Sequence, residues 1–270
     1  MATAEQGLFT SSLPELYERF LVEPLFRPFA QELLDRTALS PTDRLLDVAC
    51  GTGIVARLAE TTVVDRGRLV GVDASPAMLA KASSVAPTIE WRQGDAAQLP
   101  VRPDEAFDVV TYHQGLQFFP DKPAAVREMR RVLAPGGRVA IATWLSVDDV
   151  PLLRDLQRVA EQHLGSYVDY RHSFGGAEAL KRLLTNAGLH EVVVETVTRT
   201  VRLGGGAELF GRLNTMAVVG MSPAAKRMTD EERAHVTDAI TDDSVKALQG
   251  YVDGSELVFS LGTNVAIGHG

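Results

Sequence analysis

The chain has 270 residues, 45% of them hydrophobic and 23% charged, which is the balance of a globular protein with a sizeable core. A net charge of −8 argues against a duplex nucleic-acid binder, so we expect no nucleic-acid partner. The single cysteine, Cys50, excludes an internal disulfide and a cysteine-cluster metal site, and we expect no metal. The chain shows no 18-residue apolar run and no secretory leader, which predicts a cytoplasmic protein without a membrane span.

Residues 12–36 predict an N-terminal helical cap. Ser12 and Glu15 have the spacing of a capping box, which opens a helix. Pro24 and Pro28 are expected to break this helix before a second one reaches residue 36. The cap either packs on the core or also covers a ligand pocket, and the pattern leaves both readings open.

Residues 40–145 alternate between strand and helix, which is the signature of a parallel sheet with helices on both faces. The predicted strands cover residues 44–49, 68–73, 89–92, 107–112 and 138–144. The predicted helices cover residues 54–61, 77–84 and 122–133, and Pro135-Gly136-Gly137 is expected to form the turn before the fifth strand.

From residue 146 the pattern changes, and two more strands are expected over 192–203 and 257–267. The remaining segments, 146–190 and 204–252, are predicted to be mainly helical. We interpret them as lid or bracing insertions on one continuous domain spanning residues 1–270. The predicted helices within them cover residues 148–164, 177–187, 207–219 and 229–249.

The stretch that joins the first strand to its helix reads Cys50-Gly51-Thr52-Gly53. Gly51 and Gly53 permit backbone angles that a side chain would forbid, and they let a ligand approach the main chain and the free N–H groups of the helix. The string from Gly51 to Ala56 also satisfies G-x-G-x-x-A, with Asp73 twenty residues after Gly53. On this pattern alone, a nicotinamide dinucleotide is one candidate ligand.

Ligands of open parallel sheets lie at the carboxyl ends of the strands, and polar residues gather there. Asp73 ends the second strand and is suited to accept hydrogen bonds from ribose hydroxyls, with a cap on the next helix as the alternative. Asp95 follows the third strand and could accept from an adenine amino group or remain a loop carboxylate. Met78 and Leu99 would supply apolar walls for a base.

Five strings, read together, resemble the class I S-adenosylmethionine (SAM)-dependent methyltransferases, most closely their ubiquinone/menaquinone-biosynthesis-like small-molecule branch. They are L-L-D-V-A-C-G-T-G, V-G-V-D-A-S-P-A-M-L, G-D-A-A-Q-L-P, F-D-V-V-T-Y-H-Q-G-L-Q-F-F-P-D and V-L-A-P-G-G-R-V-A-I-A-T-W. The resemblance covers about residues 40–145. It implies an α/β, Rossmann-like, seven-stranded sheet of order 3-2-1-4-5-7-6 with the last strand antiparallel, helices on both faces and a helical lid.

The resemblance also implies roles for single residues around SAM. The methionine part would be lined by Ala49, Gly51 and Gly53, with Asp47 ordering the turn. Asp73 would hold the ribose, and Asp95 and Ala96 the adenine. The remaining cofactor-binding candidates are Ala74 and Met78 beside the adenosine, His113 and Gln114 at the end of strand four, and Tyr17 closing from the cap.

Methyl transfer is an in-line displacement, so the protein mainly supplies proximity and alignment. A general base is needed only if the acceptor must lose a proton, and His113 and His172 are the candidates. We expect a small, apolar or aromatic acceptor, methylated on O, N or C. This expectation rests on Phe9, Tyr17, Phe20, Phe26, Phe29, Tyr167, Tyr170 and Phe174. A non-catalytic SAM-binding protein and an NAD-dependent oxidoreductase are the alternatives, and the choice between monomer and homodimer stays open.

Overall fold

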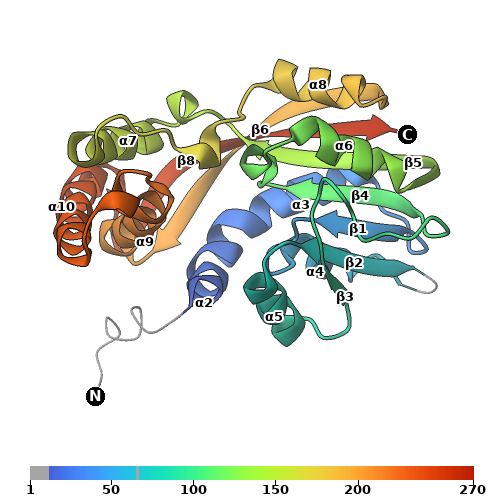
Figure 1. Ribbon diagram of the computed structural model, residues 1–270, viewed down its shortest axis with the longest axis horizontal. Helices are drawn as coiled ribbons and strands as arrows, with labels where there is room; N and C mark the ends of the chain where they lie inside the picture. The colour runs from blue at the N-terminus through green and yellow to red at the C-terminus, as the bar shows by residue number, and fades with distance from the viewer. Residues whose placement is uncertain (1–11, 65–66) are drawn as a thin grey trace. The chain divides into compact units, whose positions relative to one another are not determined.

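A computed structural model describes residues 12–64 and 67–270 of the chain (Figure 1). Phe9, part of the expected aromatic set, lies outside the described residues. The chain forms two compact units. The first unit holds the described residues up to Trp144 together with Gly176–Val197 and Thr263–Gly270, and the second holds Leu145–Gly175 and Thr198–Gly262. A lid role for the inserted segments stays a prediction.

Eight strands form one sheet, in the order β3-β2-β1-β4-β5-β8-β6, with β7 paired to β8. The strands are β1 (Arg44–Val48), β2 (Arg68–Asp73), β3 (Glu90–Gln93), β4 (Phe107–His113), β5 (Leu133–Trp144), β6 (His190–Gly204), β7 (Val252–Asp253) and β8 (Glu256–His269). The first five strands pair in parallel, and β8 runs antiparallel to β5. Since β8 is the predicted seventh strand, the predicted order is confirmed, and only the two-residue β7 is additional.

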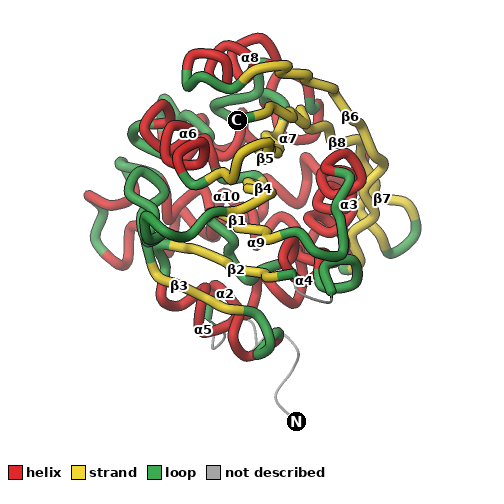
Figure 2. Tube along the Cα trace, turned by 90° about the vertical axis from the view of Figure 1, so that its right-hand side faces the viewer, coloured by secondary structure: helices red, strands yellow, loops and turns green. Residues whose placement is uncertain are grey.

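In the first unit, α3 and α4 cover one face of the sheet and α6 and α8 the other (Figure 2). The first-unit helices are α2 (Leu13–Tyr17), α3 (Arg27–Thr37), α4 (Ile54–Ala59), α5 (Pro76–Val85), α6 (Lys122–Arg131) and α8 (Ala177–Asn186). One core cluster of this unit joins Leu33 of α3 and Val55 of α4 to Leu45 and Val109 of the sheet. This packing fixes the strand ends that carry the candidate site.

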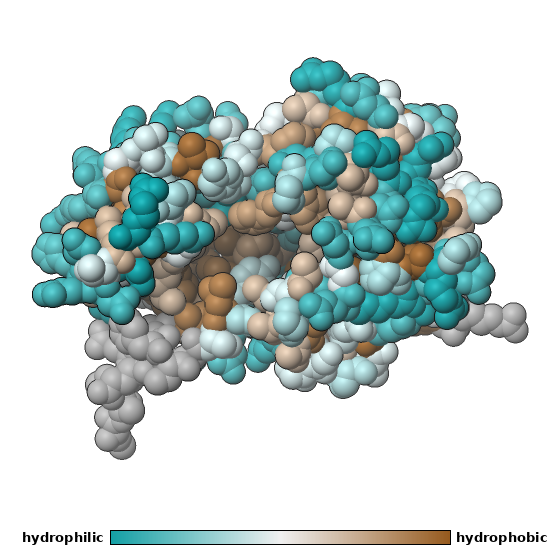
Figure 3. Space-filling view, viewed as in Figure 1, coloured by the Kyte–Doolittle hydropathy of each residue, from teal (hydrophilic) through white to brown (hydrophobic). Residues whose placement is uncertain are grey.

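In the second unit, α10 packs against both α7 and α9. The long helices of this unit are α7 (Pro151–Leu164), α9 (Gly206–Met221) and α10 (Asp230–Leu248). Their apolar residues, among them Val159, Leu164, Val218 and Ile240, form a separate core cluster. Hydrophilic side chains cover the outward surfaces of α10 and of α8, as expected for helices that bury one face (Figure 3).

The N-terminal segment is helical without a break from Leu13 to Thr37, so the prediction that its prolines interrupt the helix is wrong. The predicted capping box of Ser12 and Glu15 is present. Between α2 and α3, residues Glu18–Phe26 form a π-helical stretch (η1) that contains Pro24. There the N–H of Arg27 bonds to the carbonyl of Val22, five residues back. The wider turn accommodates a proline, whose ring and missing N–H do not fit an ordinary α-helical turn.

The boundary before β5 also differs from the prediction. β5 begins at Leu133 and includes Pro135-Gly136-Gly137, which was expected to be a turn. Phe107 pairs with Leu133 but Val109 pairs with Arg138, so the intervening residues bulge out of the ladder. Gly136 adopts a φ of 76°, so the glycine serves inside a bulge rather than in a separate turn.

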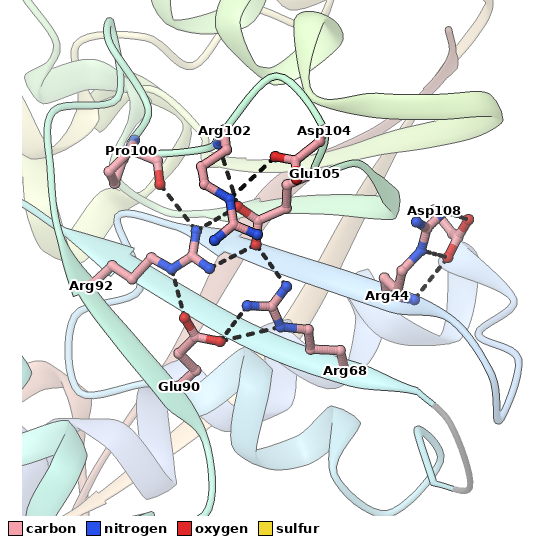
Figure 4. Close-up of polar contacts among 9 residues, drawn as sticks. All are labelled: Arg44, Arg68, Glu90, Arg92, Pro100, Arg102, Asp104, Glu105 and Asp108. Atoms are coloured by element: carbon pink, nitrogen blue, oxygen red, sulfur yellow. Dashed lines mark hydrogen bonds and ion pairs between the residues drawn. The ribbon is translucent and has the colours of Figure 1, made fainter.

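An ion-pair cluster ties β2, β3 and the loop before β4 together (Figure 4). Arg68 and Arg92 each donate to Oε1 of Glu105 at 2.6 Å, and both also pair with Glu90. The Glu105 side chain is only 4% exposed. Hydrogen bonds from Arg92, with the nearby guanidinium charges, lower the pKa of Glu105 to about 2. The cluster therefore helps to hold β2 and β3 in register.

Candidate functional site

The turn after β1 is built from residues with left-handed backbone angles. Ala49, Gly51 and Gly53 have φ values of 51°, 56° and 85°. Cys50 donates its N–H to the Val72 carbonyl at 3.0 Å, and Gly53 donates to the Cys50 carbonyl at 2.8 Å. Positive φ at Ala49 is strained for a residue with a side chain, and strain of this kind gathers at ligand-binding turns.

The two glycines of this turn face different surroundings. A Cβ on Gly51 would have no atom within 4 Å, whereas a Cβ on Gly53 would lie 2.2 Å from Cη2 of Trp91. A Cβ on Gly71 of β2 would lie 2.3 Å from Cζ3 of the same indole. Trp91 therefore occupies a slot between the two backbones, held by a 3.0 Å bond from its Nε1 to the Ala86 carbonyl. Trp91 was not among the predicted site residues, because its position in a short strand carries no ligand-binding signal.

Asp73 joins the turn to the start of α5. Its Oδ2 accepts from the N–H of Gly51 at 2.8 Å and its Oδ1 from the N–H of Ser75 at 2.8 Å. Ser75 in turn caps α5 by accepting from Met78 N–H at 3.3 Å. Each carboxylate oxygen has a second lone pair, so this anchoring leaves Asp73 able to accept hydrogen bonds from a ligand.

Asp47 lies under the turn, 1% exposed. Its Oδ1 accepts from the Thr111 hydroxyl at 3.0 Å, while its Oδ2 has no hydrogen-bond partner among the described residues. Burial raises the pKa of Asp47 to about 7, against the opposing effect of the Thr111 bond. The protonation of Asp47 therefore changes near neutral pH.

The residues predicted to hold a base lie along the ends of β2 and β3. Asp95 is exposed, and its Oδ1 accepts from the N–H of Ala97 at 2.8 Å. Ala96 is buried, Ala74 is exposed and Met78 is half-buried on α5. Buried Leu99 donates its N–H to Glu128. Asp73 and Asp95 thus also order their own loops. For Asp95 this was the alternative reading, whereas the helix cap considered for Asp73 is supplied by Ser75.

An aromatic cluster surrounds the end of β4. It consists of Tyr17, Phe26, Phe29, His113 and Trp144, with adjacent ring centroids 4.8 to 6.4 Å apart. Burial lowers the pKa of His113 to about 3, and its Nε2 has no partner in the described parts of the chain. Burial raises the pKa of Tyr17, and the charges of Glu18, Asp47 and Asp73 raise it further. The charges of the carboxylates at the turn thus act on the cap residue Tyr17.

Gln114, next to His113, is buried and has a φ of 60°. Its Nε2 donates to Oγ1 of Thr263 on β8 at 2.9 Å, and Thr263 was not among the predicted site residues. His172, the other candidate base, belongs to the second unit. Its Nδ1 bonds to the Leu145 carbonyl at 2.9 Å, and burial lowers its pKa. A catalytic role for His172 stays a prediction, as do the roles of the other candidate residues.

Within residues 12–64 and 67–270, no group of three or more His, Cys, Asp or Glu side chains is arranged to hold a metal ion. The same residues include no helix that is both long and apolar enough to cross a membrane. Among the described residues of the second unit, Tyr167 is buried and Tyr170 is exposed.

Comparison with known proteins identifies the family. The sequence profile of a family described as "Methyltransferase domain" matches residues 46–141. A 2-phytyl-1,4-naphtoquinone methyltransferase of Synechococcus elongatus is 37% identical over 165 residues, covering 58% of this chain and 70% of that protein. The chain belongs to the class I SAM-dependent methyltransferases. Within them it falls in the quinone-biosynthesis-like small-molecule branch, as the sequence motifs predicted.

Other relatives agree with this family. A demethylmenaquinone methyltransferase of Lysinibacillus sphaericus is 32% identical over 196 residues, covering 66% of this chain and 81% of that protein. The YcgJ protein of Bacillus subtilis shares the fold, with a TM-score of 0.54, 19% identity, and coverage of 89% of this chain and 97% of that one. A Haemonchus contortus phosphoethanolamine N-methyltransferase bound to S-adenosylhomocysteine has a TM-score of 0.57 and 17% identity, covering 98% of this chain and 58% of that one.

The methyltransferase is thus an enzyme of small-molecule methylation, and SAM is its cofactor. The two alternatives, an NAD-dependent oxidoreductase and a non-catalytic SAM-binding protein, gain no support from these relatives. The turn fits such a cofactor, because the open side of Gly51 leaves room beside the backbone and Asp73 retains lone pairs for hydroxyl groups. The G-x-G-x-x-A string is therefore a coincidence of pattern rather than a dinucleotide fingerprint.

Proposed function

We propose that this methyltransferase acts on a small apolar or aromatic acceptor, with reduced quinone-type rings (quinols) as the first candidates. The aromatic cluster of Tyr17, Phe26, Phe29, His113 and Trp144 carries this proposal, because flat rings and an apolar environment suit a flat, apolar substrate. The printed names of two relatives, which concern naphthoquinone and demethylmenaquinone methylation, support the same acceptor class.

For the cofactor we propose the residues that the motifs imply. Ala49, Gly51 and Gly53 would border its methionine part. Asp73 would accept from its ribose hydroxyls, with Ala74, Met78, Asp95 and Ala96 beside its adenine. When bound, SAM supplies a methyl group on a sulfonium whose leaving group needs no further activation. The protein's own contribution is then alignment and the exclusion of water by the buried ends of β1 and β4.

We propose that His113 acts as a neutral hydrogen-bond acceptor rather than as a strong base. With a pKa of about 3, its imidazole is uncharged near pH 7 and holds a proton only weakly. In the tautomer with its proton on Nδ1, the neutral ring can accept at Nε2 and so orient a hydroxyl or amine of the methyl acceptor. The pH dependence of turnover between pH 6 and 8 would then reflect the ionisation of the methyl acceptor and of Asp47, and not that of His113.

The proposal includes a small-molecule acceptor without a nucleic-acid partner and a cytoplasmic location, supported by the net charge of −8 and the lone Cys50. A homodimer is the predicted alternative to a monomer, and sedimentation equilibrium distinguishes the two.

A substrate screen tests the acceptor class. The enzyme is incubated with SAM labelled in its methyl group and with quinols, phenols, aliphatic amines, polar peptides or RNA. Transfer to quinols or phenols is the expected result. Transfer confined to peptides or RNA would exclude the proposal.

Substitution of Asp73 tests the cofactor assignment. Both Asp73 oxygens accept from backbone N–H groups, so the amide of Asp73→Asn must face one of these donors with its own NH2. We therefore expect Asp73→Asn, like Asp73→Ala, to abolish S-adenosylhomocysteine binding in calorimetry. Asp95→Asn, at an exposed site, is the control and should weaken binding less. Unchanged affinity in Asp73→Asn would remove the ribose assignment.

A further inference from the structure

A chain of hydrogen bonds connects β5, β8 and the end of β4. The Thr263 hydroxyl donates to the Thr143 carbonyl at 2.9 Å, and Gln114 Nε2 reaches Thr263 Oγ1 at 2.9 Å. Gln117 Nε2 then donates to the Gln114 carbonyl at 3.0 Å, and Lys122 Nζ donates to the Gln117 carbonyl at 3.1 Å. All of these residues belong to the first unit.

The direction of each bond in this chain is fixed by chemistry. A backbone carbonyl can only accept, so the single hydroxyl hydrogen of Thr263 is committed to Thr143. The oxygen of Thr263 must then accept, and the group facing it must be the NH2 of Gln114 rather than its Oε1. The Gln117 amide is oriented in the same way by the Gln114 carbonyl.

This orientation leaves two carboxamide oxygens facing away from the chain of bonds. Gln114 and Gln117 are 6% and 5% exposed, and the Oε1 of each has no hydrogen-bond partner within the described residues. The Nε2 of His113, adjacent to Gln114, is in the same condition. Buried carbonyl-type oxygens are costly when unpaired, so the two glutamine oxygens at one strand end indicate a ligand that donates.

We propose that Thr263 is a positioning residue that holds Gln114 Oε1 ready to accept a hydrogen bond from a ligand at the carboxyl end of β4. The ligand group is an N–H or O–H donor, and groups that only accept, such as ketones and carboxylates, are disfavoured there. The donor is either the ammonium of the cofactor or a hydroxyl or amine of the methyl acceptor. If the donor belongs to the methyl acceptor, the inference rests on the proposed function. If it belongs to the cofactor, the inference rests on the membership of the family.

Thr263→Val tests the inference, because valine keeps the shape of threonine but cannot accept from Gln114. Thr263→Ser retains the hydroxyl and is the rescue variant. Thr196→Val is the matched control, since it removes a neighbouring hydroxyl that bonds to Asn264 and not to Gln114. If Thr263→Val fails to fold, Gln114→Met, which keeps the side-chain length without Oε1, takes its place in the binding and turnover measurements.

The first readout needs no ligand. In protein labelled with ¹⁵N-glutamine, the Gln114 side-chain NH2 signal is identified by its loss in Gln114→Glu. We expect this signal to shift in Thr263→Val and to stay in place in Thr263→Ser and Thr196→Val. An unmoved signal in folded Thr263→Val overturns the inference, whatever the acceptor is.

Binding and turnover then identify the source of the donor. If it is the cofactor ammonium, Thr263→Val weakens S-adenosylhomocysteine binding about tenfold and leaves a deaminated analogue unaffected. If it is the acceptor, that affinity is unchanged and kcat/KM for a hydroxylated acceptor falls about tenfold. Unchanged affinity together with unchanged kcat/KM overturns the inference. Failure of the wild-type enzyme on every aromatic acceptor instead contradicts the proposed function, and leaves the amide-signal and cofactor measurements to decide the role of Thr263.

Discussion

At the scale of single residues, the conformation of the glycine turn after β1 depends on a tertiary contact as well as on its own sequence. Gly51 has open space where a side chain would lie, while Gly53 is pressed against the Trp91 indole. The two glycines look equivalent in the motif, but each position requires glycine for a different structural reason. Gly51 leaves space for a ligand beside the backbone, and Gly53 allows the Trp91 indole to pack directly against the turn.

Substitution of the two glycines should separate these two reasons. Gly51→Ala is expected to cost about 1 kcal/mol of unfolding free energy, the usual cost of a side chain at positive φ. Gly53→Ala adds the overlap with Trp91 and should cost about 3 kcal/mol. When Gly53→Ala is added to a Trp91→Leu protein, its cost in unfolding free energy should fall towards the cost of Gly51→Ala. Urea unfolding checks this, and strictly additive costs would contradict the role of Trp91.

His113 should make the fold sensitive to acid. Its pKa is about 3 in the folded enzyme and about 6.5 in an unfolded chain. Below pH 6.5 the unfolded state therefore binds more protons, and stability is lost as the pH falls towards 3. Asp47 acts in the opposite sense, because its raised pKa makes stability fall as the pH rises towards 7.

The comparison of wild type with His113→Phe isolates the histidine, since Asp47 is common to both. Relative to His113→Phe, we expect the wild type to lose about 2 kcal/mol of unfolding free energy between pH 7 and pH 4.5. Urea denaturation at the two pH values measures this difference. Parallel pH profiles for the two proteins would show that His113 is protonated as readily when folded as when unfolded.

Residues at the carboxyl ends of the parallel strands could be predicted from the sequence, because topology alone places these ends at one edge of the sheet. Asp73, Asp95 and His113 were found in this way. Trp91 and Thr263 could not be, since their roles depend on side-chain contacts across strands. The Gln114–Thr263 bond joins residues 149 positions apart, and no periodicity or local motif encodes such a contact.

At the scale of elements, the π-helical stretch of the cap is tied to the glycine turn by one ion pair. Glu18 of η1 accepts from Arg57 of α4 at 2.7 Å, and Arg57 also reaches the Thr52 carbonyl. The Glu18 and Arg57 side chains are only 15% and 18% exposed. The position of Tyr17, one residue before Glu18, therefore depends on a pair that also touches the turn.

Glu18→Gln should loosen this connection. It leaves Arg57 without its charged partner in a mostly buried position, and we expect a loss of about 2 kcal/mol of unfolding free energy. Faster proteolytic cleavage within Leu13–Thr37 should accompany it. Glu23→Gln is the control, because its pair with Arg27 is exposed and contributes little. Equal effects of the two substitutions on unfolding and cleavage would argue against a special role for Glu18.

The elements themselves were largely predictable, since strands and helices follow apolar periodicity and capping signals. The five parallel strands and their order were confirmed. The errors occurred where backbone geometry departs from regular patterns. Pro24 sits in a widened helical turn, and Gly136 sits in a bulge inside β5. Proline and glycine mark both places in the sequence, but they do not specify which irregular form the chain adopts.

At the scale of the whole molecule, motifs in one third of the chain were enough to predict the family. The profile match to residues 46–141 covers the strands that border the candidate cofactor site. The segments outside it carry no comparable motif. No motif predicts acceptor-binding residues in these segments, because a small-molecule pocket depends on shape rather than on a fixed string. The division into two compact units likewise depends on tertiary packing.

Ligand binding should stabilise the folded enzyme by mass action. At about 100 times its Kd, S-adenosylhomocysteine is expected to add about 2.7 kcal/mol and to raise Tm by about 5 °C. NAD at the same concentration should leave Tm unchanged, because the glycine string is not a dinucleotide fingerprint. Differential scanning calorimetry compares the two ligands directly. A shift with NAD equal to that with S-adenosylhomocysteine would contradict the cofactor assignment.

The chain contains only two tryptophans, and they lie in separate parts of the first unit. Trp91 lies beneath the glycine turn, and Trp144 lies among the rings around His113. The enzyme therefore carries two built-in optical reporters. With Trp91→Phe only the indole of the aromatic cluster emits, and with Trp144→Phe only the one under the turn. Fluorescence titration of these single-tryptophan proteins would follow cofactor and acceptor as separate events, without any attached dye.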